Sequence, residues 1–130
     1  MKEGKRILVV DDDMDIVEQV MAMLESDGHA VIGANSREEA EETLLTVIPD
    51  LVVVDLMMEE MDSGFVLCHH IRKVYPETPI IILTSVTAKT GLEFATGTPE
   101  FRSWMKADVF MDKPVRPEHL KSEVRRLLSA

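Results

Sequence analysis

The sequence has little of what a secreted, membrane-spanning or nucleic-acid-binding protein needs. It has one cysteine, Cys68, which cannot form an intrachain disulfide, and its N-terminus lacks the apolar segment typical of a secretion signal. Its longest apolar runs, such as residues 7–10, are far shorter than the roughly 20 residues that cross a membrane. Only 14 basic residues stand against 24 acidic ones, and the net charge of −10 argues against binding nucleic acid or an acidic membrane. We expect a cytoplasmic protein whose partners are proteins or cations.

The length sets a second limit, because 130 residues with 45% apolar side chains are enough for one packed core. A (β/α)₈ barrel, which needs about 250 residues, is excluded. We therefore expect a single domain over residues 1–130 with its core over about 6–129. The last predicted helix reaches nearly to Ala130 and leaves no room for a DNA-binding domain, so we expect a protein that acts alone or an excised domain.

Short apolar runs rich in β-branched residues alternate with stretches whose apolar residues recur at helical spacing. Continuously apolar runs are typical of strands that are buried on both faces of a parallel sheet. Three such runs lie at residues 7–10, 51–54 and 80–83, and less apolar strands are expected at 29–34 and 109–111. The alternation therefore predicts an α/β protein.

Local signals mark the predicted helices. A helix over about 14–26 can end at Gly28 in a left-handed cap. Ser36 and Glu39 form an S-x-x-E capping box that opens a second helix, which we expect to include Val47. Further helices are expected over about 63–74 and from Pro117 onward, whereas residues 85–107 show no regular pattern.

Polar residues follow the predicted strands at the point where each strand ends. In chain order they are Asp11, Asp12, Asp13, Asp55, Thr84 and Lys113. Because the carboxyl ends of parallel strands share one edge of a sheet, we expect these side chains to converge on one pocket. Carboxylates packed together repel one another unless a cation or protons intervene. Oxygen ligands suit Mg²⁺ and a nearby lysine suits a phosphoryl group, so the sequence predicts a magnesium-assisted phosphoryl-transfer site.

At these positions the sequence resembles the receiver domains of bacterial two-component response regulators. The family pattern has an acidic pair after the first strand, an aspartate after the third, a hydroxyl residue after the fourth and Lys-Pro after the fifth. The matching residues are Asp11, Asp12, Asp55, Thr84, Lys113 and Pro114. The resemblance covers nearly the whole chain. It implies a flavodoxin-like doubly wound fold with a five-stranded parallel sheet in the order 2-1-3-4-5 and helices on both faces.

The resemblance also implies how the site works. Asp55 would be the phosphoacceptor and would attack the phosphorus of a phosphohistidine on a partner protein. Asp12 and Asp55 would bind Mg²⁺ directly and Asp11 would bind it through water. The backbone carbonyl of Met57 would be a further ligand.

The remaining family roles concern the phosphoryl group and the output. Lys113 and the Thr84 hydroxyl would hold phosphoryl oxygens, and Thr84 with Phe110 would form the conformational switch. The partners implied are a sensor histidine kinase or a histidine phosphotransfer protein and a downstream protein target, without nucleic acid or membrane. The resemblance thus implies a signalling phosphoacceptor rather than a metabolic enzyme.

Two other functions remain open. A phosphatase of the haloacid dehalogenase type also begins with an apolar strand and D-x-D, here Asp11 and Asp13, but it leaves Asp55 unexplained and needs a cap that 130 residues barely allow. The other is a pseudo-receiver that binds a protein without being phosphorylated. Asp13 and Asp15 are better explained as a helix N-terminus, which acidic side chains stabilise, and Cys68 as a core residue.

Overall fold

The computed structural model describes residues 5–55, 63–84, 108–112 and 115–129. The strands are β1 (Arg6–Val10), β2 (Ala30–Ala34), β3 (Leu51–Asp55), β4 (Ile80–Thr84) and β5 (Val109–Asp112). The helices are α1 (Met14–Glu25), α2 (Arg37–Leu44), α3 (Ser63–Val74) and α6 (Pro117–Leu128). All neighbouring strands pair in parallel in the order β2-β1-β3-β4-β5, so the predicted α/β fold and strand order are confirmed.

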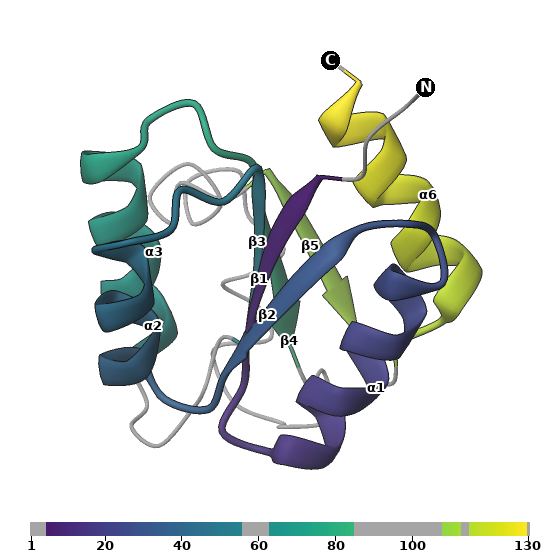
Figure 1. Cartoon of the computed structure of the whole chain (residues 1–130), viewed down its shortest axis with the longest axis horizontal. Helices are drawn as coiled ribbons and strands as arrows, with labels where there is room; N and C mark the ends of the chain where they lie inside the picture. The colour runs from purple at the N-terminus through teal and green to yellow at the C-terminus, as the bar shows by residue number, and fades with distance from the viewer. Residues whose placement is uncertain (1–4, 56–62, 85–107, 113–114, 130) are drawn as a thin grey trace.

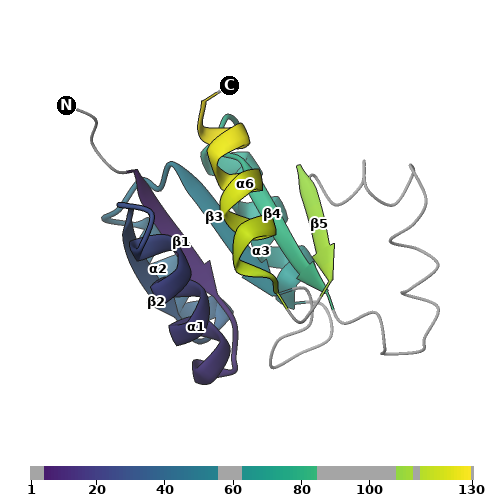
Figure 2. The same ribbon diagram turned by 90° about the vertical axis from the view of Figure 1, so that its right-hand side faces the viewer.

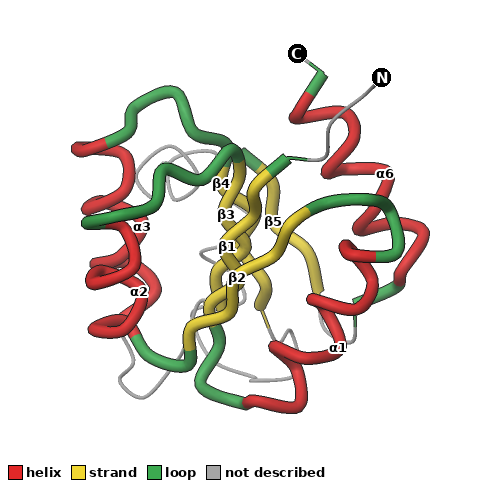
Figure 3. Tube along the Cα trace, viewed as in Figure 1, coloured by secondary structure: helices red, strands yellow, loops and turns green. Residues whose placement is uncertain are grey.

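Helices cover both faces of the sheet, α2 and α3 on one side and α1 and α6 on the other (Figures 1 and 2). Figure 3 shows the strands as a central layer between these two pairs. Alternate residues of β3 explain this arrangement. Val52 and Val54 belong to the buried cluster that includes α2 and α3 side chains, whereas Leu51 and Val53 belong to the cluster that includes α1 and α6 side chains. A continuously apolar strand is therefore buried on both faces, as the sequence predicted.

Three strands run one residue further than their apolar runs predicted. β3 ends at Asp55, β4 at Thr84 and β5 at Asp112, each a polar residue that still pairs with its neighbour or closes the ladder. β2 begins at Ala30 rather than at residue 29. The backbone N–H of Ala30 makes the first hydrogen bond between the two strands, to the carbonyl of Lys5 just before β1. Asp55, Thr84 and Asp112 are therefore held by the hydrogen bonds of the sheet and do not belong to the loops that follow.

The expected helix caps are present. The Ser36 hydroxyl accepts a hydrogen bond from the Glu39 backbone N–H at 3.0 Å, while the Glu39 carboxylate reaches back to the N–H of Asn35 at 2.7 Å. The reciprocal bond thus goes to the residue before the cap rather than to the cap itself. Gly28 has a φ of 91°, the left-handed conformation that its position after α1 predicted.

The expectation that the second helix includes Val47 was wrong, because α2 ends at Leu44. The N–H groups of Leu45 and Thr46 bond to carbonyls three residues back, at Glu42 and Thr43, both at 3.1 Å. Such tight turns close the helix and redirect the chain. The apolar residues after Leu44 therefore lie outside the helix.

Arg72 links the residues just before β4 to Asp108, the residue just before β5. Its guanidinium donates hydrogen bonds to the carbonyls of Pro76 and Thr78 at 2.8 and 3.0 Å and forms an ion pair with Asp108 at 3.0 Å. The Asp108 carboxylate also accepts a bond from the Ile80 N–H at 2.8 Å. This network helps to fix the register of two strands whose opposite ends carry polar residues.

α1 approaches β2 closely at Gly33. A Cβ atom built at this glycine would lie 2.7 Å from Cγ1 of Val17 and 3.0 Å from Sδ of Met21. We expect Gly33→Ala to lower the free energy of unfolding by about 1–3 kcal/mol, because α1 must shift to admit the methyl group. Urea denaturation measures the change. The double variant Val17→Ala/Gly33→Ala is the control, since removing Cγ1 should reduce the cost of the glycine substitution, and strictly additive effects would contradict the explanation.

Asp27, just after α1, is bound by Arg125 of α6 through two hydrogen bonds of 2.9 and 2.8 Å. This interaction lowers the pKa of Asp27 below its usual value. A lowered pKa in the folded state stabilises the protein above the unfolded pKa of about 3.9, and that contribution is lost as the pH falls through the folded pKa.

We therefore expect Asp27→Asn to be less stable than wild type at pH 7, with the difference shrinking as the pH approaches 2.5. Urea denaturation at several pH values tests this. Glu25→Gln removes a neighbouring exposed carboxylate and leaves the Arg125 pair intact, so it should not reproduce the trend. A difference for Asp27→Asn that does not change with pH would contradict the assignment.

Candidate functional site

The candidate site lies at the carboxyl ends of the strands, where the register brings polar residues together. Val10 is opposite Val54, so Asp11 follows β1 at the level where Asp55 ends β3. Asp55 is in turn opposite Leu83 of β4, and the next residue, Thr84, is opposite Asp112 of β5.

Three carboxylates meet at this edge. One carboxylate oxygen from each of Asp11, Asp12 and Asp55 can be chosen such that all three lie within 4.8 Å of one another. Asp11 and Asp55 are only 1% and 5% exposed, whereas Asp12 is exposed to solvent. The sequence prediction that these residues converge is therefore confirmed for the three aspartates.

Backbone hydrogen bonds hold Asp11 in place. Its N–H donates to the carbonyl of Ala34 at the end of β2, at 3.1 Å, and its side-chain Oδ1 accepts from the N–H of Asp13 at 3.0 Å. The Asp13 carboxylate in turn accepts from the N–H of Asp15 and forms the N-cap of α1. The turn after β1 and the start of α1 are thus built as one hydrogen-bonded unit.

Sequence reasoning missed part of this unit. It listed Asp13 with the converging side chains and favoured a helix N-terminus for it, but it did not predict that the backbone N–H of Asp13 orients Asp11. The side chain of an aspartate in a turn commonly accepts a hydrogen bond from the backbone N–H two residues later, so Asp11 itself was a sequence clue to this contact. The Ala34 carbonyl had none, because a backbone acceptor leaves no trace in the residue type.

The chemistry of this donor set suits a hard divalent cation. All three side chains offer carboxylate oxygens, the ligand type that Mg²⁺ and Ca²⁺ prefer over the nitrogen and sulfur ligands that favour zinc. Three negative charges this close repel one another, and a cation between them removes that repulsion. The residues present therefore fit a magnesium ion.

The other predicted site residues are placed in part. Thr84 is the last residue of β4, and Phe110 lies in β5, partly buried against the cluster that includes α2 and α3 side chains. Lys113 and Met57 lie outside the described residues. The structure thus describes the acidic half of the predicted site and the strand that leads to Lys113.

Cys68 takes no part in the site. It is fully buried in the cluster beneath α2 and α3, and burial raises the pKa of its thiol to about 12. A thiol with such a pKa is almost entirely protonated at neutral pH and is a poor nucleophile. The prediction that Cys68 is a core residue is confirmed.

A family model described as the response regulator receiver domain matches residues 7–125. The chain belongs to this family. As a receiver domain it has the strand order and the acidic cluster described above. Receiver domains of this family are the signal-accepting modules of two-component response regulators, so the resemblance noted in the sequence is confirmed.

Two curated proteins of Bacillus subtilis illustrate the similarity. The receiver domain is 34% identical over 129 residues to the alkaline phosphatase synthesis transcriptional regulatory protein PhoP. This match covers 96% of this chain and 49% of PhoP. It is 36% identical over 126 residues to the transcriptional regulatory protein YvrH, covering 95% of this chain and 48% of YvrH. The receiver domain therefore spans about half the length of these curated relatives.

Solved structures give the same result. A CheY-like receiver domain protein from Methanospirillum hungatei matches with a TM-score of 0.83 and 27% identity, over 98% of this chain and 95% of that chain. Chemotaxis response regulator CheY4 of Vibrio cholerae matches with a TM-score of 0.79 and 26% identity, over 95% and 98% of the two chains. In the described part of the receiver domain, none of the helices has the length and apolar character required for a membrane span.

The N-cap of α1 allows a direct test of how the site loop is supported. We expect Asp13→Ala to lower the free energy of unfolding by about 1 kcal/mol, because the N–H of Asp15 loses its side-chain acceptor. Asp13→Asn is the control, since an asparagine oxygen also caps a helix and should retain most of the stability. Thermal or urea denaturation distinguishes them, and equal losses in both variants would show that charge rather than capping matters.

Proposed function

We propose that this receiver domain accepts a phosphoryl group on Asp55 in histidine-to-aspartate signalling. The observation that carries the proposal is the meeting of Asp11, Asp12 and Asp55 at one edge of the sheet, in a chain of the receiver family. Asp55 ends the central strand β3, between β1 with its acidic pair and β4 with Thr84. That central position favours Asp55 as the group that receives phosphate.

In this mechanism Asp55 is the nucleophile. One of its carboxylate oxygens attacks the phosphorus of a phosphohistidine on the partner, so that a P–O bond forms as the P–N bond breaks. The electron pair of the broken bond stays on the imidazole, which takes up a proton from water. The product is an acyl phosphate on Asp55. Asp55 is the last residue of β3 and pairs with Leu83 of β4, so the sheet fixes the backbone from which its carboxylate extends.

The three aspartates would hold magnesium, Asp12 and Asp55 directly and Asp11 through water, with the Met57 carbonyl as a further ligand. Bound magnesium supplies positive charge that offsets the repulsion between the carboxylates and the phosphoryl oxygens. The burial of Asp11 and Asp55 supports this role, because a carboxylate in a poorly solvated position gains more from a nearby cation than an exposed one does.

The end of β4 and the end of β5 would complete the site. We propose that the Thr84 hydroxyl and the Lys113 ammonium hold phosphoryl oxygens and that Thr84 couples to Phe110 when phosphate binds. The pairing of Thr84 with Asp112 supports the proximity of these ends, since Lys113 is the next residue. Phe110 is partly buried against the cluster that includes α2 and α3 side chains, so its movement would change the packing of that cluster.

The proposed partners follow from the family. A sensor histidine kinase or a histidine phosphotransfer protein would donate the phosphoryl group, and a downstream protein would recognise the phosphorylated domain. Residues 1–130 would act together as one cytoplasmic receiver module. The net charge of −10 supports protein partners over nucleic acid or an acidic membrane.

The phosphatase alternative lacks support. It requires Asp11 as the nucleophile and leaves Asp55, whose carboxylate lies in the same cluster as that of Asp11, without a role. The chain also matches the receiver family over residues 7–125. The pseudo-receiver alternative makes the opposite prediction to ours in the following experiment.

We expect the wild-type chain to gain one phosphoryl group from acetyl phosphate in the presence of magnesium, and Asp55→Asn to gain none, because an amide cannot supply the nucleophile. Intact-mass spectrometry measures the modification. Chelation of magnesium should prevent it in the wild type. The matched control is Asp13→Asn, which removes a nearby negative charge outside the proposed ligand set and should still be phosphorylated.

Two results would contradict the proposal. An alkali-labile phosphoprotein formed by Asp55→Asn would place the acceptor elsewhere. A wild-type chain that neither accepts phosphate from acetyl phosphate nor binds beryllium fluoride with magnesium would support the pseudo-receiver. Thermal unfolding of Asp55→Asn shows whether the variant is folded.

A further inference from the structure

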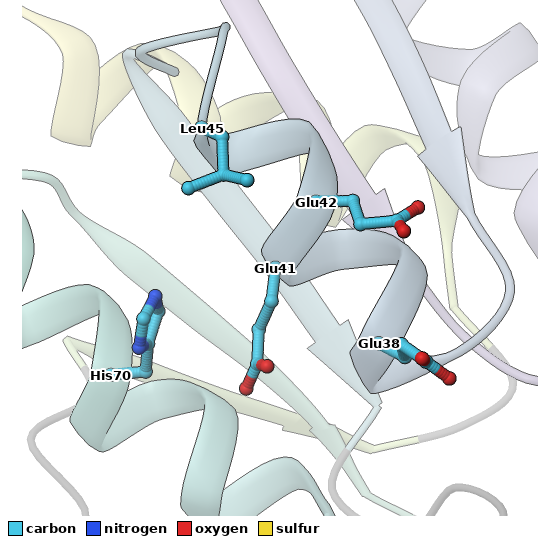
Figure 4. A pocket seen from close by; sticks show the side chains of 5 residues that line it. All are labelled: Glu38, Glu41, Glu42, Leu45 and His70. Atoms are coloured by element: carbon cyan, nitrogen blue, oxygen red, sulfur yellow. The ribbon is translucent and has the colours of Figure 1, made fainter.

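A second feature lies on the face of the molecule formed by α2 and α3. A pocket of about 320 Å³ lies between these helices and is lined by Glu38, Glu41, Glu42, Leu45 and His70. Figure 4 shows the three glutamates on α2, Leu45 directly after the end of α2, and His70 opposite them on α3. We call this region, together with Ile48, the α2–α3 surface.

The α2–α3 surface exposes large apolar side chains. Leu45 is 83% exposed and Ile48 is 62% exposed, although both are aliphatic. Of the five large hydrophobic residues that are exposed in the described part of the chain, four lie on α3 or just after α2. These are Leu45, Ile48, Val66 and Val74, with Met14 of α1 as the fifth. A concentration of exposed aliphatic groups on one face is typical of a surface that another molecule covers.

The charges of the same surface are unbalanced. Glu38 and Glu42 are exposed, lie four residues apart on α2, and repel each other as like charges on one side of a helix. Among the described residues, neither of these two glutamates forms an ion pair, whereas Glu41 is paired with Arg37 at 3.5 Å. No lysine or arginine is among the residues that line the pocket. Positive groups on a partner would therefore meet uncompensated carboxylates.

We propose that the α2–α3 surface docks a basic amphipathic segment of a partner protein. Apolar side chains of the segment would cover Leu45 and Ile48, and its lysine or arginine side chains would pair with Glu38 and Glu42. The net charge of −10 would speed the approach of such a partner. The proposal does not depend on phosphorylation of Asp55.

A second copy of this chain is a poorer occupant. A symmetric contact would place the same glutamates of two copies against each other, and each copy carries a net charge of −10. Like charges facing each other across an interface oppose association. A basic partner satisfies both the apolar and the acidic parts of the surface.

The test uses the full unphosphorylated chain and a fluorescent amphipathic peptide of lysine, leucine and alanine, long enough for about four helical turns. Nitrogen-15 NMR locates the contact and fluorescence anisotropy measures the affinity. We expect amide shifts concentrated on α2, the turn after it and α3. A peptide with glutamate in place of lysine should not bind.

Variants separate a specific surface from general attraction between opposite charges. Glu38→Gln/Glu42→Gln should weaken peptide binding about fivefold, as expected for the loss of two exposed ion pairs. Leu45→Ser should weaken it about tenfold because an apolar contact is lost. The matched control is Glu18→Gln/Glu25→Gln on α1, which removes the same charge from exposed positions on the other face of the sheet and should change the affinity less than twofold.

The proposal is overturned if the α1 double variant weakens binding as much as the α2 double variant, or if the amide shifts lie on α1 and α6. It is also overturned if the peptide does not bind in a saturable way. Sedimentation of the chain alone tests whether a second copy occupies the surface. Self-association that Leu45→Ser abolishes would assign the surface to a second copy and overturn the proposal.

Discussion

The candidate site depends on the parallel register of β1, β3 and β4. Because Val10 lies opposite Val54 and Asp55 lies opposite Leu83, the acidic pair after β1 and the aspartate that ends β3 reach the same edge. A slip of one residue would turn every side chain of a strand to the other face of the sheet. Both faces are filled by helices, so such a slip would disrupt two apolar clusters at once. The core therefore enforces the geometry of the carboxylates.

Bringing three carboxylates together lowers the stability of the fold, but it also creates a site that suits a cation. Asp11 and Asp55 are buried beside Asp12, and three carboxylates within 4.8 Å repel one another. A fold that brings them together needs compensation from elsewhere, and the buried strands and the hydrogen bonds around Asp11 supply it. Sites that break the usual rules of packing are expected where function requires them. The same repulsion is what a bound cation removes.

The sequence predicted the parts of the fold that depend on local pattern. Apolar runs identified the central strands, and Ser36 and Gly28 marked helix ends. Prediction from the sequence failed where the position of a residue depends on contacts beyond its local pattern. Val47 fits the apolar spacing of the second helix but lies beyond its end at Leu44, and the contacts of Arg72 with Asp108 and of Asp27 with Arg125 join residues far apart in sequence. For the site, strand ends placed the three aspartates correctly, because parallel strands share an edge. The roles of Met57 and Lys113 rest on the family resemblance.

The most direct test of the account is to locate a divalent cation in crystals of the wild-type chain. Manganese prefers the same oxygen ligands as magnesium and can be identified by its anomalous scattering. The account predicts an anomalous peak within about 2.2 Å of carboxylate oxygens of Asp12 and Asp55, with Asp11 on the same side. A peak at another group of acidic residues, or no peak at this edge of the sheet in crystals soaked with manganese, would contradict it.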